Sequence, residues 1–513
     1  MRLFLFAVGG TGSRILKPLV MQCAAGMCPI IDGKRNEDVE IVPIIMDPHA
    51  TNENLKQTDH LLRWYRELRK EIYKNKSDGN GSQRGFFDIK ISTLRDVVQN
   101  TNLNDTFLFN LGGMDSKKFG DFIDFKNMQP GDQALCSMLF SNDQLATTLG
   151  IGFVGSPNIG SVALNQFRDS EEYKQFTNVF RKEDKIFIIS SIFGGTGAAG
   201  YPIIVKNIRN ASNDNRTNGG DLSDSIIGAL TVLPYFNISE DENSQVNASD
   251  FIQKTKSALE YYQRNITKDN EPSVNVCYYL GDEALSKAYD NDPGYNGQKN
   301  DAHIVEFIGA LDVFHFLSLR DEDLSSSNGH ADTCHKYEYG FKQAVDENKH
   351  IDFKDFGTAN GVAVINEMIS RMKKFHLLYL YLQYGLSENL SARFAKDAPS
   401  LDSSFLNSNF FTRLKDDFLG EYITWLKEMQ NNHRSFTPFN LETTEPAKSI
   451  TGYFKKKSFF SSSLGYREMT QLLNKASENK ANSFNEGEAP GKLIKLFDMA
   501  SDEMISDKYF SQA

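Results

Sequence analysis

The sequence predicts an α/β protein with a largely parallel sheet, and three observations lead to this fold class. Over the first 320 residues, short apolar runs rich in β-branched residues alternate with longer stretches of helical periodicity, as in repeated strand–helix units. Several of these runs end in glycine-bearing turns that lead directly into a helical stretch. The apolar segment 302–319 then predicts a helix that is buried nearly all round, as expected between two packed layers.

Six runs are predicted to be strands: residues 3–8, 39–46, 106–111, 185–191, 225–233 and 274–280. Residues 51–145 interrupt the alternation and suggest an insertion with small elements of its own, including a polar helix at 61–75. Residues 321–340 have the composition of a loop, and 361–385 predict a second long helix. We therefore expect a domain over 1–300, a central helix over 301–320, and a mainly helical C-terminal domain with a polar tail over 321–513.

Composition narrows the class of protein. With 513 residues, 40% of them hydrophobic, the chain can bury a large core in two or more domains. Its net charge of −11 argues against a dedicated nucleic-acid binder, which normally carries a basic face. The five cysteines lack zinc-like spacing, so no metal site is expected from them. The absence of a signal-like N-terminus or a long apolar span predicts a cytoplasmic protein that does not enter membranes.

The first glycine loop follows the first strand in the sequence VGGTGSR. Its members are Gly9, Gly10, Thr11, Gly12 and Ser13. A P-loop would need a Lys-Ser/Thr pair where the chain has Ser13-Arg14, and a dinucleotide fingerprint would need a glycine where Ile15 stands. Two interpretations stay open: a less specific nucleotide loop whose amides contact phosphate, and a tight turn without a ligand.

Two further glycine loops precede predicted helices. One lies in IFGGTGAAG, before a helix expected at 198–210, and contributes Gly194, Gly195, Thr196 and Gly197. The other lies in VGSPNIGS and contributes Gly155, Ser156, Asn158 and Gly160. Asp47 ends the second strand, at the edge where parallel sheets bind ligands, although an Asp-Pro pair also suits a plain turn. One polyphosphate would explain the three loops together.

These loops resemble those of the tubulin/FtsZ family. GGTGAAG resembles the family signature, with Phe193 in place of its first glycine, and GSPNIGS, VGGTGSR and MDPHATN resemble three other nucleotide loops in the same order. TVLPYF, with Pro234, resembles the loop that touches the ribose. YYLGDEAL, with Asp282, resembles the loop that reads guanine, although Gly281 replaces an Asn. Asn300 and His303 precede the apolar helix, where the family stacks and hydrogen-bonds the base.

The resemblance implies a GTPase that binds GTP/GDP with Mg²⁺ and assembles head to tail into filaments, each subunit completing its neighbour's site with two carboxylates. HIDFKDFG resembles that acidic loop, and the resemblance implies that Asp352 and Asp355 are the two carboxylates that complete the neighbour's site. The alternative interpretation is that Asp352 and Asp355 are two exposed acids on a loop. Two other functions stay open: a non-hydrolysing nucleotide-binding scaffold or sensor that engages an adaptor or effector through its C-terminal domain, and a dinucleotide-dependent enzyme, which Asp47 favours and Ile15 disfavours.

Overall fold

The computed structural model describes most of the chain. The residues that it leaves undescribed are 37, 49–51, 75–84, 100–101, 110–113, 115–116, 152, 154–155, 214–219, 239–247, 283–287, 290–299, 341–349, 357–361, 451–453, 456–462, 479–483, 486–487, 507–508, 510 and 513.

The core is a seven-stranded sheet in which every pair of neighbouring strands is parallel. Across the sheet the strands are β13 (His335–Gly340), β9 (Val276–Gly281), β7 (Ile226–Val232), β6 (Lys185–Ser191), β1 (Arg2–Val8), β4 (Glu40–Met46) and β5 (Lys90–Ile91). β1, β4, β6 and β7 are buried along almost their whole length, which explains their continuous apolar sequences. The α/β fold class is confirmed.

Strand order places a topological switch at β1. The chain passes from β1 outward to β4 and β5, and later continues from β6, on the other side of β1, toward β13. Val8 pairs with Met46 of β4 and with Ser190 of β6, so the carboxyl ends of these three strands lie at one edge. In open parallel sheets, ligands bind outside the strand ends at such a switch point.

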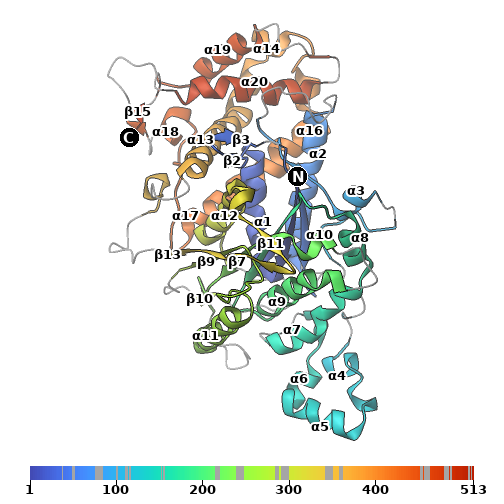
Figure 1. The fold of residues 1–513 in the computed structure, drawn as a ribbon. Helices are drawn as coiled ribbons and strands as arrows, with labels where there is room; N and C mark the ends of the chain where they lie inside the picture. Colours follow the sequence, from blue (N-terminus) through green and yellow to red (C-terminus); the bar gives the residue numbers. More distant parts are fainter. Residues whose placement is uncertain are drawn as a thin grey trace.

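Helices cover both faces of the sheet (Figure 1). One face carries α1 (Gly9–Ala24), α2 (Glu53–Ile72) and α12 (Ile304–Ser318). The other carries α7 (Pro157–Leu164), α8 (Glu171–Val179), α9 (Gly195–Arg209) and α11 (Ala248–Asn265). Alternate strand residues reach the two layers: Phe4 packs on Phe176 of α8 with ring centroids 4.9 Å apart, and Phe187 packs on Phe316 of α12 at 5.3 Å.

Helix α12 is the buried helix that the sequence predicts. All but three of its fifteen residues are buried. Gly309 lets it approach the sheet, since a Cβ atom there would lie 2.8 Å from Leu230 of β7. Phe307, on another side of the helix, packs on Trp425 and Phe436, with ring centroids 5.9 and 5.2 Å away. The helix therefore lies between the sheet and the C-terminal helices.

The C-terminal helices form a further layer on α1, α2 and α12, at the top of Figure 1. They include α13 (Val362–Leu380), α17 (Leu419–Asn431), α19 (Tyr466–Ser477) and α20 (Ala489–Met504). Arg371 of α13 binds Asp498 of α20 at 2.9 Å. A Cβ atom on Gly491 would lie 2.6 Å from the carbonyl oxygen of Ile72, so α20 packs closely on α2.

Residues 51–145 take part in the fold in two ways. Their first part supplies α2 and the edge strand β5, which belong to the central layers. Residues 117–148 form a projection that we call the arm, at the bottom of Figure 1. The arm contains α4 (Phe119–Phe122), α5 (Pro130–Leu139) and α6 (Asn142–Ala146).

Two strand predictions differ from the structure. Of the strand predicted at 106–111, the described residues 106–109 form only one isolated parallel bridge, between Leu108 and Ile45. Residues 335–340, predicted to be loop, form strand β13 at the sheet edge. An edge strand with one neighbour tolerates the polar sequence HKYEYG, and that polarity made it resemble a loop. Among the described helices, none is both long and apolar enough to cross a membrane.

A buried histidine should make stability depend on pH. His376 is 1% exposed, stacks on Phe439 with ring centroids 4.0 Å apart, and forms a 2.8 Å hydrogen bond between Nε2 and Ser449 Oγ. Burial lowers its pKa from 6.5 to about 3. The unfolded chain therefore binds more protons between these two values, and the free energy of unfolding falls as the pH drops below 6.5.

We expect His376→Gln to lose less stability on acidification from pH 6.5 to 4.5 than the parent does. The difference has an upper limit of about 1.4 kcal/mol per pH unit, the value for one proton. Urea unfolding at several pH values measures it, with His60→Gln at an exposed histidine as the matched control. Parallel pH profiles for the parent and His376→Gln would contradict the assignment.

Candidate functional site

Helix α1 begins immediately after β1, so the first glycine loop is itself the first turn of the helix. Gly9 has φ of +74°, a conformation open to glycine, and it turns the chain from strand to helix in one residue. Gly10 is exposed, and a Cβ atom there would have no neighbour within 4 Å among the described residues. Thr11 is half-buried, whereas Gly12 and Ser13 are buried beneath the turn. The first N–H groups of α1 thus lie at the sheet edge, next to Gly10.

Helix α9 begins in the same way at the end of β6. The structure starts this helix at Gly195 rather than at 198, so Gly195, Thr196 and Gly197 are its first turn, with Gly194 as the N-cap. A Cβ atom on Gly197 would lie 2.6 Å from the carbonyl oxygen of Ser191. A Cβ atom on Gly9 would lie 3.3 Å from the amide nitrogen of Gly197. The starts of α1 and α9 are therefore in contact.

Helix α7 brings a third N-terminus to this place. Ser156 is its N-cap, and Asn158 is exposed in its first turn. A Cβ atom on Gly160 would lie 2.7 Å from Ala199 Cβ and 3.2 Å from the carbonyl oxygen of Gly195, so α7 starts against the start of α9. Gly155, predicted in the same loop, lies outside the described residues. We call the first turns of the three helices, residues 9–12, 157–160 and 195–198, the cradle.

The cradle helices differ from other helices of the chain in how they begin. None of the three has a side-chain cap or an acidic residue in its first turn. By contrast, α2 and α8 are capped by Asn52 and Ser170 and carry glutamates in their first turns. The first N–H groups of a helix have no partner within it and carry a partial positive charge. Three such ends in contact, with no acid among them, form a site suited to a polyanion.

Asp47 lies at the margin of the cradle. It follows Met46, the partner of Val8, and so stands one residue beyond the paired ends of β4 and β1. Its side chain is half-buried. Beneath the cradle, the buried hydroxyls of Ser13 and Ser190 have no hydrogen-bond partner among the described residues.

Asp282 and His303, predicted to contact a base, engage protein groups. Both carboxylate oxygens of Asp282 accept hydrogen bonds from Arg434, at 2.5 and 2.6 Å, and His303 Nε2 lies 3.5 Å from Asp282 Oδ2. His303 Nδ1 accepts from the amide of Val305 at 3.1 Å. Burial, with the charges of Arg434 and Arg14, lowers the pKa of His303 to about 3, so its ring is neutral near pH 7.

A second set of contacts joins α1 to the start of α12. Arg14 Nε donates to Glu306 Oε1 at 2.6 Å, and the Tyr235 hydroxyl donates to the same oxygen at 3.0 Å. Arg14 also donates to the carbonyl oxygen of Asp301 at 3.1 Å. Glu306 and Arg434 cannot be predicted from the sequence as part of this region, because their partners lie 292 and 152 residues away and no local pattern connects them.

Asn300 and Pro234 lie at the side of the cradle where the base is expected. Pro234 follows β7 and is half-buried, and its carbonyl oxygen accepts from the amide of Asp282 at 3.4 Å. Asn300 is 7% exposed, and its buried Oδ1 atom has no hydrogen-bond partner in the described part of the chain. Asn300 thus keeps an acceptor atom that no described protein group uses.

Asp352 and Asp355 belong to a surface turn. Asp352 Oδ1 accepts from the amide of Lys354 at 2.7 Å, and Asp355 Oδ2 accepts from the amide of Asp352 at 2.9 Å. The neighbouring Phe356 packs on Phe307, with ring centroids 6.2 Å apart. Because Phe307 is the fourth residue of α12, the turn lies beside the first half of that helix.

Other acids directly follow α12. Asp321, Glu322 and Asp323 form a short 3₁₀ turn at its C-terminal end. Asp321 Oδ1 lies 2.6 Å from Nζ of Lys185, the first residue of β6. This acidic turn is therefore at the edge of the sheet opposite to the cradle. The sequence alone does not mark this turn as a candidate site, because an acidic run after a helix is usually a solvated turn.

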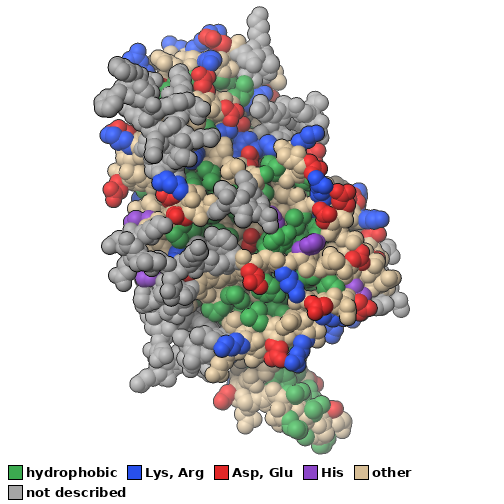
Figure 2. Space-filling model, turned by 60° about the vertical axis from the view of Figure 1, so that its left-hand side comes forward, with side chains coloured by type: hydrophobic (Ala, Val, Ile, Leu, Met, Phe, Trp, Pro, Cys, Tyr) green, Lys and Arg blue, Asp and Glu red, His purple; other side chains and the backbone are tan. Residues whose placement is uncertain are grey.

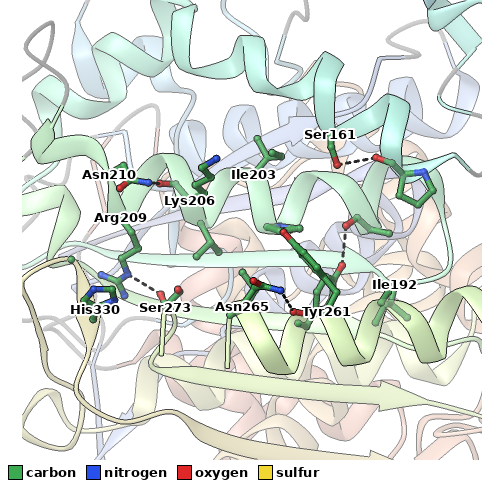
Figure 3. A pocket seen from close by; sticks show the side chains of 18 of the residues that line it. Ser161, Ile192, Ile203, Lys206, Arg209, Asn210, Tyr261, Asn265, Ser273 and His330 are labelled. Atoms are coloured by element: carbon green, nitrogen blue, oxygen red, sulfur yellow. Dashed lines mark hydrogen bonds between the residues drawn. The ribbon is translucent and has the colours of Figure 1, made fainter. Parts of the chain in front are cut away.

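A groove of about 1410 Å³ lies beside the cradle, and Figure 3 shows it from close by. It extends from Asn158 and Ile192 along α9, past Ile203 and Lys206, and α11 with Tyr261 forms its other wall. We call it the α9–α11 groove. Pro157, Asn158 and Ala198 of the cradle line one end of the groove, whereas Gly10 and Thr11 do not, so the groove opens onto one side of the cradle.

Comparison with protein-family models finds no match, and no curated protein matches the chain. Function is therefore inferred from the geometry of the site and from the order of its glycine loops along the chain.

Two glycines of the cradle should respond differently to the same substitution. Gly197→Ala places a methyl group 2.6 Å from a backbone oxygen, and we expect it to lower the free energy of unfolding by roughly 1–3 kcal/mol. Gly10→Ala enters open space and should change it by less than about 0.5 kcal/mol. Urea unfolding without nucleotide measures both variants. Equal stabilities would show that Gly197 is not packed as described.

Proposed function

We propose that this chain is a GTP-binding and GTP-hydrolysing protein of the tubulin/FtsZ type. The observation that carries the proposal is the meeting of three uncapped helix N-termini at the carboxyl edge of a parallel sheet, where the strand order switches. A nucleoside triphosphate has the negative charge and the length to engage all three. The order of the three glycine loops along the chain supports the tubulin/FtsZ type among phosphate binders.

The position of α12 is also in keeping with this type. The resemblance implies a central helix between the nucleotide domain and a second domain, and α12 lies between the sheet and the C-terminal helices. Its first turn is joined to α1 by Arg14 and Glu306. A change at the cradle would thus act directly on α12.

Catalysis of phosphoryl transfer needs positioning and charge stabilisation more than covalent chemistry. The backbone N–H groups of residues 10–11, 158–159 and 195–197, which precede the first intrahelical donors, would hold the phosphate oxygens and stabilise charge that develops on them. Mg²⁺, when bound, supplies neutralising charge. Within the described residues no three His, Cys, Asp or Glu side chains cluster as a metal site, so phosphates and water would supply most of its ligands, with Asp47 the acid at the cradle margin.

The base would lie on the side of Asn300. The Oδ1 atom of Asn300, which has no partner among the described residues, is an acceptor suited to an N–H group of guanine, whereas the carboxylate of Asp282 is bound by Arg434. We therefore assign base recognition to Asn300 and a supporting role to Asp282 and His303.

We expect GTP to bind at least tenfold more tightly than ATP, which is about 1.4 kcal/mol. Gly10→Asp should abolish binding, because it sets a carboxylate against the phosphates, while Gly10→Asn, of nearly the same size and neutral, should retain most of it. Titration calorimetry measures all of these affinities, and circular dichroism checks the fold. Binding of GTP to Gly10→Asp as to the parent would exclude the cradle as the phosphate site.

Hydrolysis is proposed to require the next subunit in a head-to-tail filament. The acids that complete the site would then be presented away from the subunit's own cradle. Glu322 and Asp323 meet this condition by lying at the opposite edge of the sheet, and Asp352 and Asp355 are the pair that the resemblance indicates. The carboxylates of the second pair already accept hydrogen bonds within their own turn.

GTPase activity per subunit should therefore rise with protein concentration. Alanine substitution of the pair that acts in trans should slow hydrolysis by roughly a hundredfold or more, with GTP affinity nearly unchanged. The two pairs, Glu322/Asp323 and Asp352/Asp355, serve as matched controls for one another in a phosphate-release assay. Activity that does not depend on concentration, with neither pair affecting it, would contradict hydrolysis in trans.

That outcome would favour the second candidate, a nucleotide-binding scaffold or sensor that does not hydrolyse its ligand and engages a partner protein through the C-terminal helices. The strand order also occurs in dinucleotide-binding domains, so NAD(P) binding should be measured by the same titration calorimetry as GTP and ATP binding.

A further inference from the structure

The arm ends in an exposed apolar helix face. Leu135, Met138 and Leu139 of α5 are 56%, 84% and 61% exposed. They are spaced three and four residues apart, so they share one side of the helix. Figure 2 shows apolar side chains at the tip of the arm, lowest in the view. An exposed apolar cluster on a projecting element marks an interaction site.

The arm presents this face from a packed structure. Phe119 and Phe140 pack edge to face, with ring centroids 4.8 Å apart, and Cys136, on another side of α5, lies 3.6 Å from the Met128 sulfur. Ser141 caps the next helix, α6, reciprocally with Gln144. The face is thus formed before any partner binds, which lowers the entropy cost of docking.

The α9–α11 groove is open to solvent and runs along two helices, so a further helix can lie in it. The ten residues of α5 form a helix about 15 Å long, which is shorter than the fifteen residues of α9 that form one wall. The lining of the groove includes the apolar residues Pro202, Ile203 and Ala258, together with Tyr261, which is 50% exposed. An amphipathic helix docks in such a groove through residues spaced as i, i+3 and i+4.

The charges of the two surfaces are complementary. Lys206 of α9 lines the groove and is exposed. Asp132 is exposed in the first turn of α5, beside the apolar face. Opposite charges at the margin of an apolar contact favour the correct register and exclude other partners.

We propose that α5 of one copy of this chain docks in the α9–α11 groove of a second copy. The base of the arm adjoins the groove, since Gln144 Nε2 lies 3.4 Å from Asn158 Oδ1, and the arm extends away from α9 (Figure 1). The tip therefore does not lie in its own groove. Reciprocal exchange of arms between two copies gives a closed twofold dimer. This contact does not depend on the GTPase proposal.

Sedimentation velocity of the full chain without nucleotide tests the dimer. The parent should sediment as a dimer, and Met138→Glu should raise the dissociation constant at least tenfold. Ser137→Glu, on the opposite side of α5, is the matched control and should leave it unchanged. On the groove side, Ile203→Glu should weaken the dimer as Met138→Glu does, and Tyr261→Ala repeats the test at an exposed position where folding is not at risk.

Cross-linking tests the register of the contact. A Leu135→Cys/Cys136→Ser chain is mixed with a separate Tyr261→Cys chain and oxidised gently. A covalent pair that joins the two different chains is expected, and the same mixture carrying Met138→Glu should give much less. Monomers at all concentrations would overturn the proposal. So would association that Met138→Glu, Ile203→Glu and Tyr261→Ala leave unchanged.

Discussion

The close approach of backbone at the carboxyl ends of β1 and β6 is the constraint on which the site depends. Helices α1, α7 and α9 all begin there. Gly9 and Gly160 leave no side chain between the helix starts, and Gly197 lets α9 begin directly against Ser191 of β6. A methyl group at Gly160 or Gly197 would lie within 3 Å of neighbouring atoms. The same packing leaves Gly10 open to solvent. Glycine is therefore needed in this region first for packing, and the anion-binding character follows from where the packed helix ends point.

The start of α12 connects this region to the C-terminal half of the chain. Glu306 binds Arg14 of α1, and Asp282, next to His303, binds Arg434 beyond α17. These ion pairs are almost fully buried, so the cost of removing their charges from water offsets much of their attraction. Their main effect is to fix the relative positions of α1, α12 and the 432–434 segment, because only one arrangement of these three pairs every charge. Ligand binding at the cradle would act on the C-terminal helices through this arrangement.

The proposed surfaces overlap only at the starts of α7 and α9. The cradle is at one edge of the sheet, the acidic turn after α12 is at the other, and the arm and the α9–α11 groove lie on the layer of α7, α9 and α11. An assembly through the sheet edges and a dimer through the arms would meet at Pro157, Asn158 and Ala198, which belong to both the cradle and the groove. Substitutions at Gly10 and at Met138 alter the two contacts separately, because neither residue is shared.

The sequence by itself determined the elements whose pattern is local. It determined β1, β4, β6, β7 and β9, because strands buried on both faces have continuous apolar sequences, and α12, because a helix buried between layers is apolar all round. Only the tertiary structure placed β13 at the sheet edge, bound Asp282 to Arg434, and set Asp352 beside the first half of α12. The periodicity of apolar residues indicates which residues are buried, but it does not indicate which residues they contact. Partners such as Asp282 and Arg434, 152 residues apart, are brought together only when the layers pack.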